Sequence, residues 1–432
     1  MVFYKNKQSV EGGLIQKIDG VICLDLLLFD LSIAAMLIVC ISRYKSVITP
    51  FSVIASVYTL LINLNNLVFT HIYGYYPVNT NALLVLLLFF AVIFLVDLTG
   101  AAALEKLTFS KQASLAVPAN EMIIALLFAF GFLSYLVQFI LVSMEYGIDG
   151  AKGNNNGILG HWSMFAFMIL PIFLEVAFQS KDRKKILGAL VLAAGTFLLS
   201  VLFGGKYVIM INVMYLAIYF LLKHPENINI KKIFTIGVVV LCVVLVVFLV
   251  LYCVVPLISG AYGESATFGG AAVFAMKQIF DYLIGPIVAN NYTIEHAGEW
   301  NSLVPFTVPY NIFERFLGNR EYVNPIITNL MQISSDATTN VSGILGELVY
   351  CLGLFGGLAY AAVGFALTNT IYVIFRKCNL YLMTTGYLLA MIFMCFFCNF
   401  FTVAGAFLPL AYLFITETVL HGVQFFREKR RK

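Results

Sequence analysis

Apolar residues in this chain form long runs that are separated by short polar stretches. Many runs reach 18 residues or more with few charges, as expected of a helix that crosses a bilayer. We predict about eleven such helices (10–13), at residues 21–42, 49–70, 82–103, 121–143, 161–179, 186–203, 207–222, 233–255, 350–375, 380–401 and 405–424. The ten-residue alternating segments of a transmembrane β-barrel are absent. The predicted fold class is therefore an all-α polytopic membrane protein.

One long stretch, residues 256–349, interrupts this series of spans. It separates an N-terminal group of membrane helices at 1–255 from a C-terminal group with a basic tail at 350–432. Within it, GGAAVFAMKQIFDYLIGP has the spacing of an amphipathic helix at the membrane interface, and PYNIFERFLG predicts a second, short helix. Because the stretch is rich in aromatic residues, we expect an ordered cap and no flexible linker.

Lysine and arginine are concentrated on one side of the predicted bundle. Most of the 26 lie in six segments, at 43–45, 105–111, 181–185, 223–232, 376–377 and 427–432. Cytoplasmic loops carry such an excess, so we predict a cytoplasmic C-terminus and an extracytoplasmic loop at 256–349. Lys206, in the tight turn GGK between two predicted spans, falls on the outer side against this trend.

Composition narrows the function classes further. Hydrophobic residues make up 61% of the chain and charged residues 11%, against about a quarter charged in soluble domains. The basic segments are explained by topology, so no nucleic-acid partner is expected, and no glycine-rich phosphate loop predicts a nucleotide cofactor. Acidic residues inside spans are either functional or helix–helix hydrogen-bonding groups; they are Asp25, Asp30, Asp97 and Glu175.

Three segments resemble the O-antigen polymerase family of the Wzy type. They are FDYLIGPIVANN (280–291), VPFTVPYNIFERFLG (304–318) and TTNVSGILGELVYCLGLFGGLAYAAVGF (338–365). GGK at 204–206 falls where many members have a Gly-Arg turn, although lysine replaces the commoner arginine. The resemblance implies a GT-C-like architecture. It also implies a polymerase that joins polyprenyl-pyrophosphate-linked oligosaccharide repeat units into O-antigen or capsular polysaccharide.

The same resemblance implies the setting of the reaction. The enzyme would be a glycosyltransferase of lipopolysaccharide or capsule biosynthesis, working at the outer face of the bacterial inner membrane. Its partners would be undecaprenyl-pyrophosphate-linked oligosaccharides, the lipid bilayer, a chain-length regulator and a flippase. No cofactor and no metal are expected, since cationic side chains can neutralise the leaving pyrophosphate.

This reaction requires cations for the pyrophosphate and a base for the acceptor hydroxyl group. We predict that Lys206 and Arg315 face the pyrophosphate, because preorganised cations stabilise charge that develops on the leaving oxygen. Glu347 and His296 are the candidate bases. The structural alternatives are a snorkelling lysine, an arginine that stabilises the end of its own helix, and ordinary surface residues.

A second set of residues is expected to bind the substrate around these groups. Basic side chains would contact phosphate, and tyrosine rings would stack on sugars. The candidates are Arg320, Lys277, Tyr282, Tyr310 and Asn340.

Two other functions remain open at this stage. An O-antigen ligase shares the architecture but transfers the finished glycan to a lipid A core. A lipid-linked oligosaccharide flippase would alternate access through two similar halves, and the chain shows no internal repeat.

Overall fold

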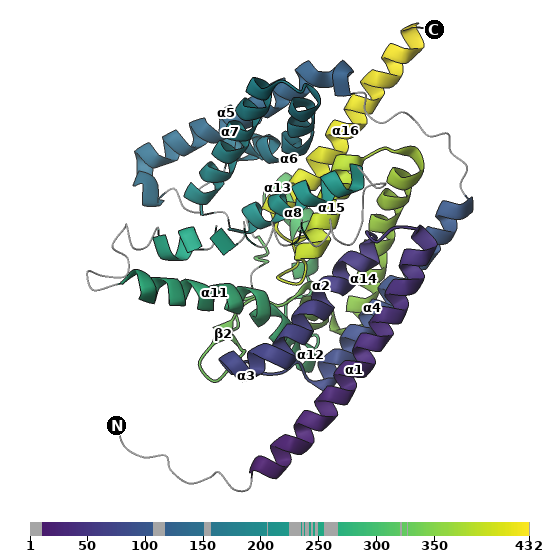
Figure 1. Ribbon diagram of the computed structural model, residues 1–432, viewed down its shortest axis with the longest axis vertical. Coiled ribbons are helices and arrows are strands. Elements are labelled where there is room, and N and C mark those ends of the chain that lie inside the picture. The colour runs from purple at the N-terminus through teal and green to yellow at the C-terminus, as the bar shows by residue number, and fades with distance from the viewer. Residues whose placement is uncertain are drawn as a thin grey trace.

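The computed structural model describes residues 11–106, 117–150, 157–204, 206–223, 249–254, 267–319, 322–325 and 327–431, with isolated positions between 235 and 246. The chain is almost entirely helical (Figure 1). The N-terminal elements are α1 (Glu11–Tyr44), α2 (Pro50–Leu64), η1 (Asn65–Phe69), α3 (Thr70–Tyr73), α4 (Thr80–Lys106), α5 (Val117–Gly150), α6 (Gly157–Gln179), α7 (Arg183–Leu202), α8 (Lys206–Lys223) and η3 (Val250–Val254). The remaining elements are α11 (Phe268–Val288), α12 (Asn290–Glu295), η4 (Val304–Phe306), α13 (Thr307–Phe316), β1 (Met331–Gln332), β2 (Thr338–Thr339), α14 (Ile344–Cys378), α15 (Leu382–Met394) and α16 (Ala404–Arg431).

The predicted fold class is confirmed, since the chain is an all-α protein with many helices fit to cross a membrane. In the described part of the chain, nine helices are long and apolar enough to do so, and eight of them match predicted spans. Two other predicted spans appear as shorter apolar helices, Tyr207–Lys223 and Leu382–Met394. The predicted span at 233–255 lies mostly outside the described residues.

The helices pack as two groups with a connecting layer between them. Helices α5, α6 and α7 contact one another on one side, and α1, α2, α4 and α14 contact one another on the other (Figure 1). Helices α8, α15 and α16 lie between the groups, with α8 packed along α15. This connecting layer therefore determines how the two groups face each other.

The basic segments share one end of the helices in both groups. Ion pairs join neighbouring helices there, Arg43 to Glu105 at 3.6 Å and Lys185 to Glu121 at 3.9 Å. Helix α8 ends at this level with Lys223. Among the described residues, these basic side chains lie at helix ends that neighbour one another.

The predicted cap contains helices α11, α12 and α13 and the short hairpin β1–β2. The first cap helix is confirmed as α11, but together with α12 it is also long and apolar enough to count as a candidate span. Figure 1 shows α11 running crosswise to α1 and α14. Its polar side is held by the hairpin and the loop before α4, through Lys277–Asp336 at 3.2 Å and the Tyr75 hydroxyl group, which donates to Asp281.

A kink in α14 joins the cap to the membrane helices. Gly353 has φ of +69°, in the left-handed region that glycine tolerates, and interrupts the helix. The carbonyl groups of Val349 and Tyr350 accept hydrogen bonds from the backbone N–H groups of Gly298 and Trp300, both at 3.0 Å. The cap backbone thus satisfies acceptors near the kink, as burial requires.

Candidate functional site

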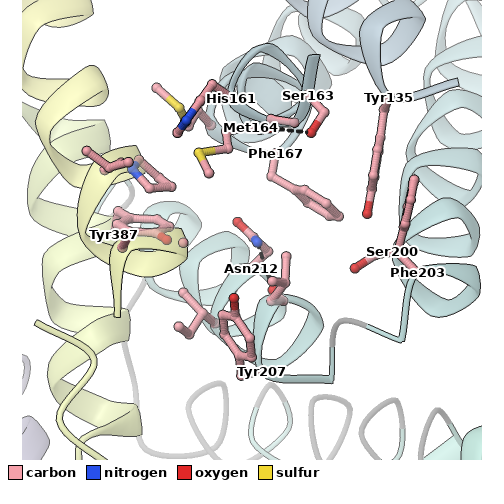
Figure 2. Close-up of a pocket in the computed structure, with 18 of the residues that line it drawn as sticks. Tyr135, His161, Ser163, Met164, Phe167, Ser200, Phe203, Tyr207, Asn212 and Tyr387 are labelled. Carbon is pink, nitrogen blue, oxygen red and sulfur yellow. Dashed lines mark hydrogen bonds between the residues drawn. The ribbon is translucent and has the colours of Figure 1, made fainter. Parts of the chain in front are cut away.

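A cavity of about 350 Å³ lies where α5, α6, α7, α8, α15 and α16 meet. It is at the end of these helices opposite to the basic segments, because α6, α8 and α16 begin at its wall and α7 ends there. Its size is typical of small-ligand sites. Figure 2 shows its main side chains, which are Tyr135, His161, Ser163, Met164, Phe167, Ser200, Phe203, Tyr207, Asn212 and Tyr387.

Glycine residues shape the wall of the cavity. Gly204 has φ of +71° and lets the chain reverse from α7 into α8 within a few residues. Gly405, at the start of α16, lies against Tyr207, and a Cβ atom there would be 2.6 Å from the tyrosine hydroxyl oxygen. Gly204, the first residue of GGK, therefore forms part of the cavity wall, and Gly405 allows Tyr207 to lie along that wall.

Polar groups in the cavity lack partners among the described residues. Asn212 donates from Nδ2 to the carbonyl oxygen of Val208 at 2.7 Å, while its buried Oδ1 accepts no hydrogen bond. The buried Nδ1 of His161 is also without a partner. Figure 2 places Asn212 between Tyr387 and Tyr135. Since an unpaired buried polar atom is costly, these atoms favour water or a hydroxyl-bearing ligand in the cavity.

The described wall of the cavity contains no lysine, arginine, aspartate or glutamate side chain. Tyr135 approaches Ser200, so hydroxyl groups add further donors and acceptors. Such a wall suits a neutral polar molecule with several hydroxyl groups better than it suits an ion. The N-terminus of α8, which begins at Lys206 beside the lining residue Tyr207, contributes a partial positive charge there.

An irregular segment, Cys395–Val403, separates the cavity from a buried acid. Helix α15 has only 13 residues, and the segment that follows is largely buried although it is not helical. The carbonyl oxygen of Cys395 accepts from Tyr58 Oη at 3.2 Å and from the backbone N–H of Ile344 at 2.8 Å. Irregular backbone inside a membrane protein needs such internal partners.

Glu347 is on the far side of this segment from the cavity. It belongs to the first turn of α14, is 3% exposed and lies beside Asn399, and its Oε1 has no hydrogen-bond partner among the described residues. One residue further on, Phe400 packs against Tyr207 with ring centroids 6.0 Å apart. Glu347 therefore lies beside the irregular segment that packs against the cavity wall, but Glu347 does not itself line the cavity.

The other predicted catalytic residues have different surroundings. Arg315 is exposed on α13. His296 ends α12, where its ring stacks on Tyr292 at 4.0 Å and its Nδ1 lies 2.9 Å from the Tyr292 carbonyl oxygen. The side chain of Lys206 lies outside the described residues, although its backbone begins α8 beside the lining residue Tyr207.

The predicted substrate-binding residues are spread over the cap. Lys277 is engaged with Asp336, and Asn340 is exposed in the loop after β2. Tyr282 packs on Phe397 with ring centroids 5.5 Å apart, which places it at the irregular segment near Glu347. Tyr310 is partly buried on α13, and Arg320 lies outside the described residues.

Sequence reasoning missed most of the cavity. His161 and Asn212 are single polar residues in long apolar runs, which is the one signal that could have marked them. The tyrosine residues gave no signal, because aromatic residues are common throughout the chain. Among the described residues, no three His, Cys, Asp or Glu side chains lie close enough to form a metal site.

Comparison with protein-family models, with curated proteins and with solved structures finds no match to this chain. The site must therefore be interpreted from its own residues.

Proposed function

We propose that this protein is a metal-independent glycosyltransferase that joins lipid-pyrophosphate-linked oligosaccharide repeat units, as in O-antigen polymerases. The observation that carries the proposal is the cavity itself. Its wall has no Lys, Arg, Asp or Glu side chain and contains unpaired hydrogen-bonding atoms, and Gly204 and Tyr207, on either side of the GK pair, line it. Unpaired hydrogen-bonding atoms in the wall suit sugar hydroxyl groups, and a lysine at the neighbouring turn suits a phosphate group beside the sugar.

The position of the cavity supports the same assignment. It lies at the helix ends opposite to the lysine- and arginine-rich ends, which the positive-inside rule assigns to the cytoplasm. The cavity would then face the extracytoplasmic side, where lipid-linked repeat units are joined. In this orientation the cap and the cavity share one face of the membrane.

The proposed reaction transfers a glycan from one lipid carrier to the next repeat unit. The hydroxyl oxygen of the acceptor sugar attacks the anomeric carbon of the donor, and the bond from that carbon to the pyrophosphate oxygen breaks. The hydroxyl proton passes to Nδ1 of His161, and the polyprenyl pyrophosphate leaves with the bonding electron pair. Lys206 stabilises the charge on the leaving oxygen, and Asn212 Oδ1 accepts a hydrogen bond from a sugar hydroxyl group.

The test is polymerisation by the purified protein in vesicles that contain only lipid-linked repeat units. The wild type is expected to lengthen glycan chains, while His161→Ala and Lys206→Ala lose about 100-fold or more of the turnover. Arg315→Ala tests whether the exposed arginine also contributes. Asn63→Ala is the matched control, because Asn63 bonds to Asp30 at 2.8 Å and does not line the cavity.

Folding and product identity decide how the result is read. Each variant is checked by thermal unfolding, with His161→Gln as a conservative substitute if the alanine variant does not fold. Full turnover by folded His161 variants and by Lys206→Ala contradicts the proposed site. Transfer of glycan to a lipid A core without chain lengthening would instead identify a ligase.

The interrupted helix favours one second candidate, a flippase for lipid-linked oligosaccharides. Discontinuous helices beside a buried polar group often mark transport sites, and α15, the segment Cys395–Val403 and Glu347 have this arrangement. Movement of a fluorescent lipid-linked sugar across vesicle membranes without bond formation would support the flippase.

A further inference from the structure

Helix α13 has two very different sides. Ile312, Phe313, Phe316 and Leu317 fall on one side of the helix at 100° per residue. All four are exposed, and Phe313 and Phe316 are 60% and 87% exposed. The helix therefore presents a continuous apolar surface outward. A helix in a cap surrounded by water would present polar residues there.

The polar side of α13 is bonded to the protein. Asn311 exchanges two hydrogen bonds with the backbone of Val323, both 2.9 Å long. Glu314 accepts from Asn319 Nδ2 at 2.6 Å. In a water-facing helix the apolar side packs inward and the polar side meets solvent. Thr307 and Val308 in the first turn of α13 are buried, but from Asn311 onward the helix has the reverse arrangement, which is favourable where the surroundings are apolar.

The short helix η4, which leads directly into α13, packs on an outward-facing side of α14. Tyr360 of α14 donates from its hydroxyl group to the carbonyl oxygen of Pro305 at 2.9 Å and packs on Phe306 with ring centroids 5.4 Å apart. Val363 and Leu367 follow on the same side of α14, one and two turns towards its basic end, and are 63% and 65% exposed. Because α14 is a candidate membrane span, this stripe would contact lipid.

We propose that α13 is an interfacial membrane helix, with its apolar side in the leaflet on the cap side of the bilayer. Phe313 and Phe316 reach the acyl-chain boundary, and Arg315, on the neighbouring part of the helix, meets lipid phosphate groups. The partner is the phospholipid leaflet itself. The inference is independent of the proposed sugar transfer, since it concerns only what surrounds the cap.

The test measures whether position 316 is in contact with acyl chains. The full-length protein, with Trp162→Phe and Trp300→Phe to remove its two tryptophan residues, receives Phe316→Trp and is placed in vesicles of acyl-brominated phosphatidylcholine. Bromine quenches tryptophan fluorescence at contact. Phe316→Trp is expected to be quenched as strongly as Leu367→Trp on the lipid-facing side of α14.

Ser335→Trp, in the exposed loop of the cap hairpin, is the control that should remain unquenched. If Phe316→Trp behaves like Ser335→Trp, the inference is wrong. It is equally wrong if Phe316→Trp is shielded only when the protein concentration in the vesicles rises, because a second copy would then cover α13. Should the tryptophan-free parent not fold, the same comparison is made by subtracting the signal of the wild-type protein.

Discussion

Two regions of this protein bury polar side chains among apolar helices, with opposite outcomes. In the group formed by α1, α4 and α14, the single hydroxyl proton of Tyr44 is shared between the Asp97 carbonyl oxygen at 2.9 Å and Asn369 Oδ1 at 2.8 Å, and Asn369 Nδ2 donates to the Val96 carbonyl oxygen at 2.9 Å. In the cavity, His161 Nδ1 and Asn212 Oδ1 have no partner among the described residues. The cluster of Tyr44, Asp97 and Asn369 is thus structural, whereas the two cavity atoms are available to a ligand.

The acidic residues that sequence analysis marked are bonded to other helices in both groups, since Asp25 and Asp30 are on α1 and Glu175 is on α6. Asp30 accepts from Asn63 at 2.8 Å, and Thr80 donates to Asp25. Glu175 lies 3.1 Å from Lys223 Nζ. For these residues the helix–helix alternative is confirmed. An intramembrane acid therefore needs its neighbours to be known before it is assigned a role.

The largest expected difference between the regions concerns activity. Asn212→Leu should lower polymerisation turnover about tenfold, because it removes one hydrogen bond to an uncharged ligand. The unfolding temperature should stay the same or rise, because the lost Oδ1 had no partner to leave behind. Turnover and thermal unfolding are measured on the same vesicle preparation. A large drop in stability would show that Asn212 is structural after all.

Tyr44→Phe is the reciprocal change in the other region. It removes the hydroxyl group that joins α1 to Asp97 and Asn369, so the free energy of unfolding should fall by about 1 kcal/mol. Turnover should be unchanged, since Tyr44 does not line the cavity. The measurement is equilibrium unfolding in mixed micelles with the polymerisation assay beside it. Lost turnover with unchanged stability would reverse the assignment of the two regions.

The smallest effect is expected outside the spans, where the hairpin β1–β2 meets α11. The Ser334 hydroxyl group and the Lys277 ammonium group lower the pKa of Asp336 from its usual 3.8. A lowered pKa means that the contact stabilises fully above that usual value and is lost as pH falls through the lowered one. Hydrogen exchange of the hairpin should therefore accelerate only in strong acid. Lys277→Gln should reduce this pH dependence, and an unchanged profile would show that the ion pair is not needed.

Much of the fold could be predicted because the bilayer constrains the chain locally. Backbone groups in lipid must bond within their own segment, so an apolar run of sufficient length becomes a helix wherever it occurs. The predicted helix boundaries were less accurate where other parts of the protein supply the hydrogen-bond partners of the backbone. The segment at 380–401 was expected to be one span, but α15 ends at Met394, and Tyr58 and Ile344 bond to the irregular backbone that follows.

The candidate site was less predictable than the fold. The turn containing Lys206 was singled out, and Gly204 and Tyr207, two residues of this turn, line a cavity, while the role of Lys206 stays a prediction. Glu347 was singled out as well, but it is buried beside Asn399 and does not line the cavity. Solvent access is a property of all the helices that surround a residue, and no local pattern encodes it.

The sequence by itself determined which segments are membrane helices and which of their ends are basic, because hydrophobicity and charge act on each segment separately. Only the tertiary structure decided which buried polar groups are paired. Tyr44 and Asn369 meet across 325 positions of the chain, whereas Asn212 faces a hollow between helices. The physical reason is that a hydrogen bond requires two groups within about 3 Å, and for distant residues this separation depends on how the helices pack.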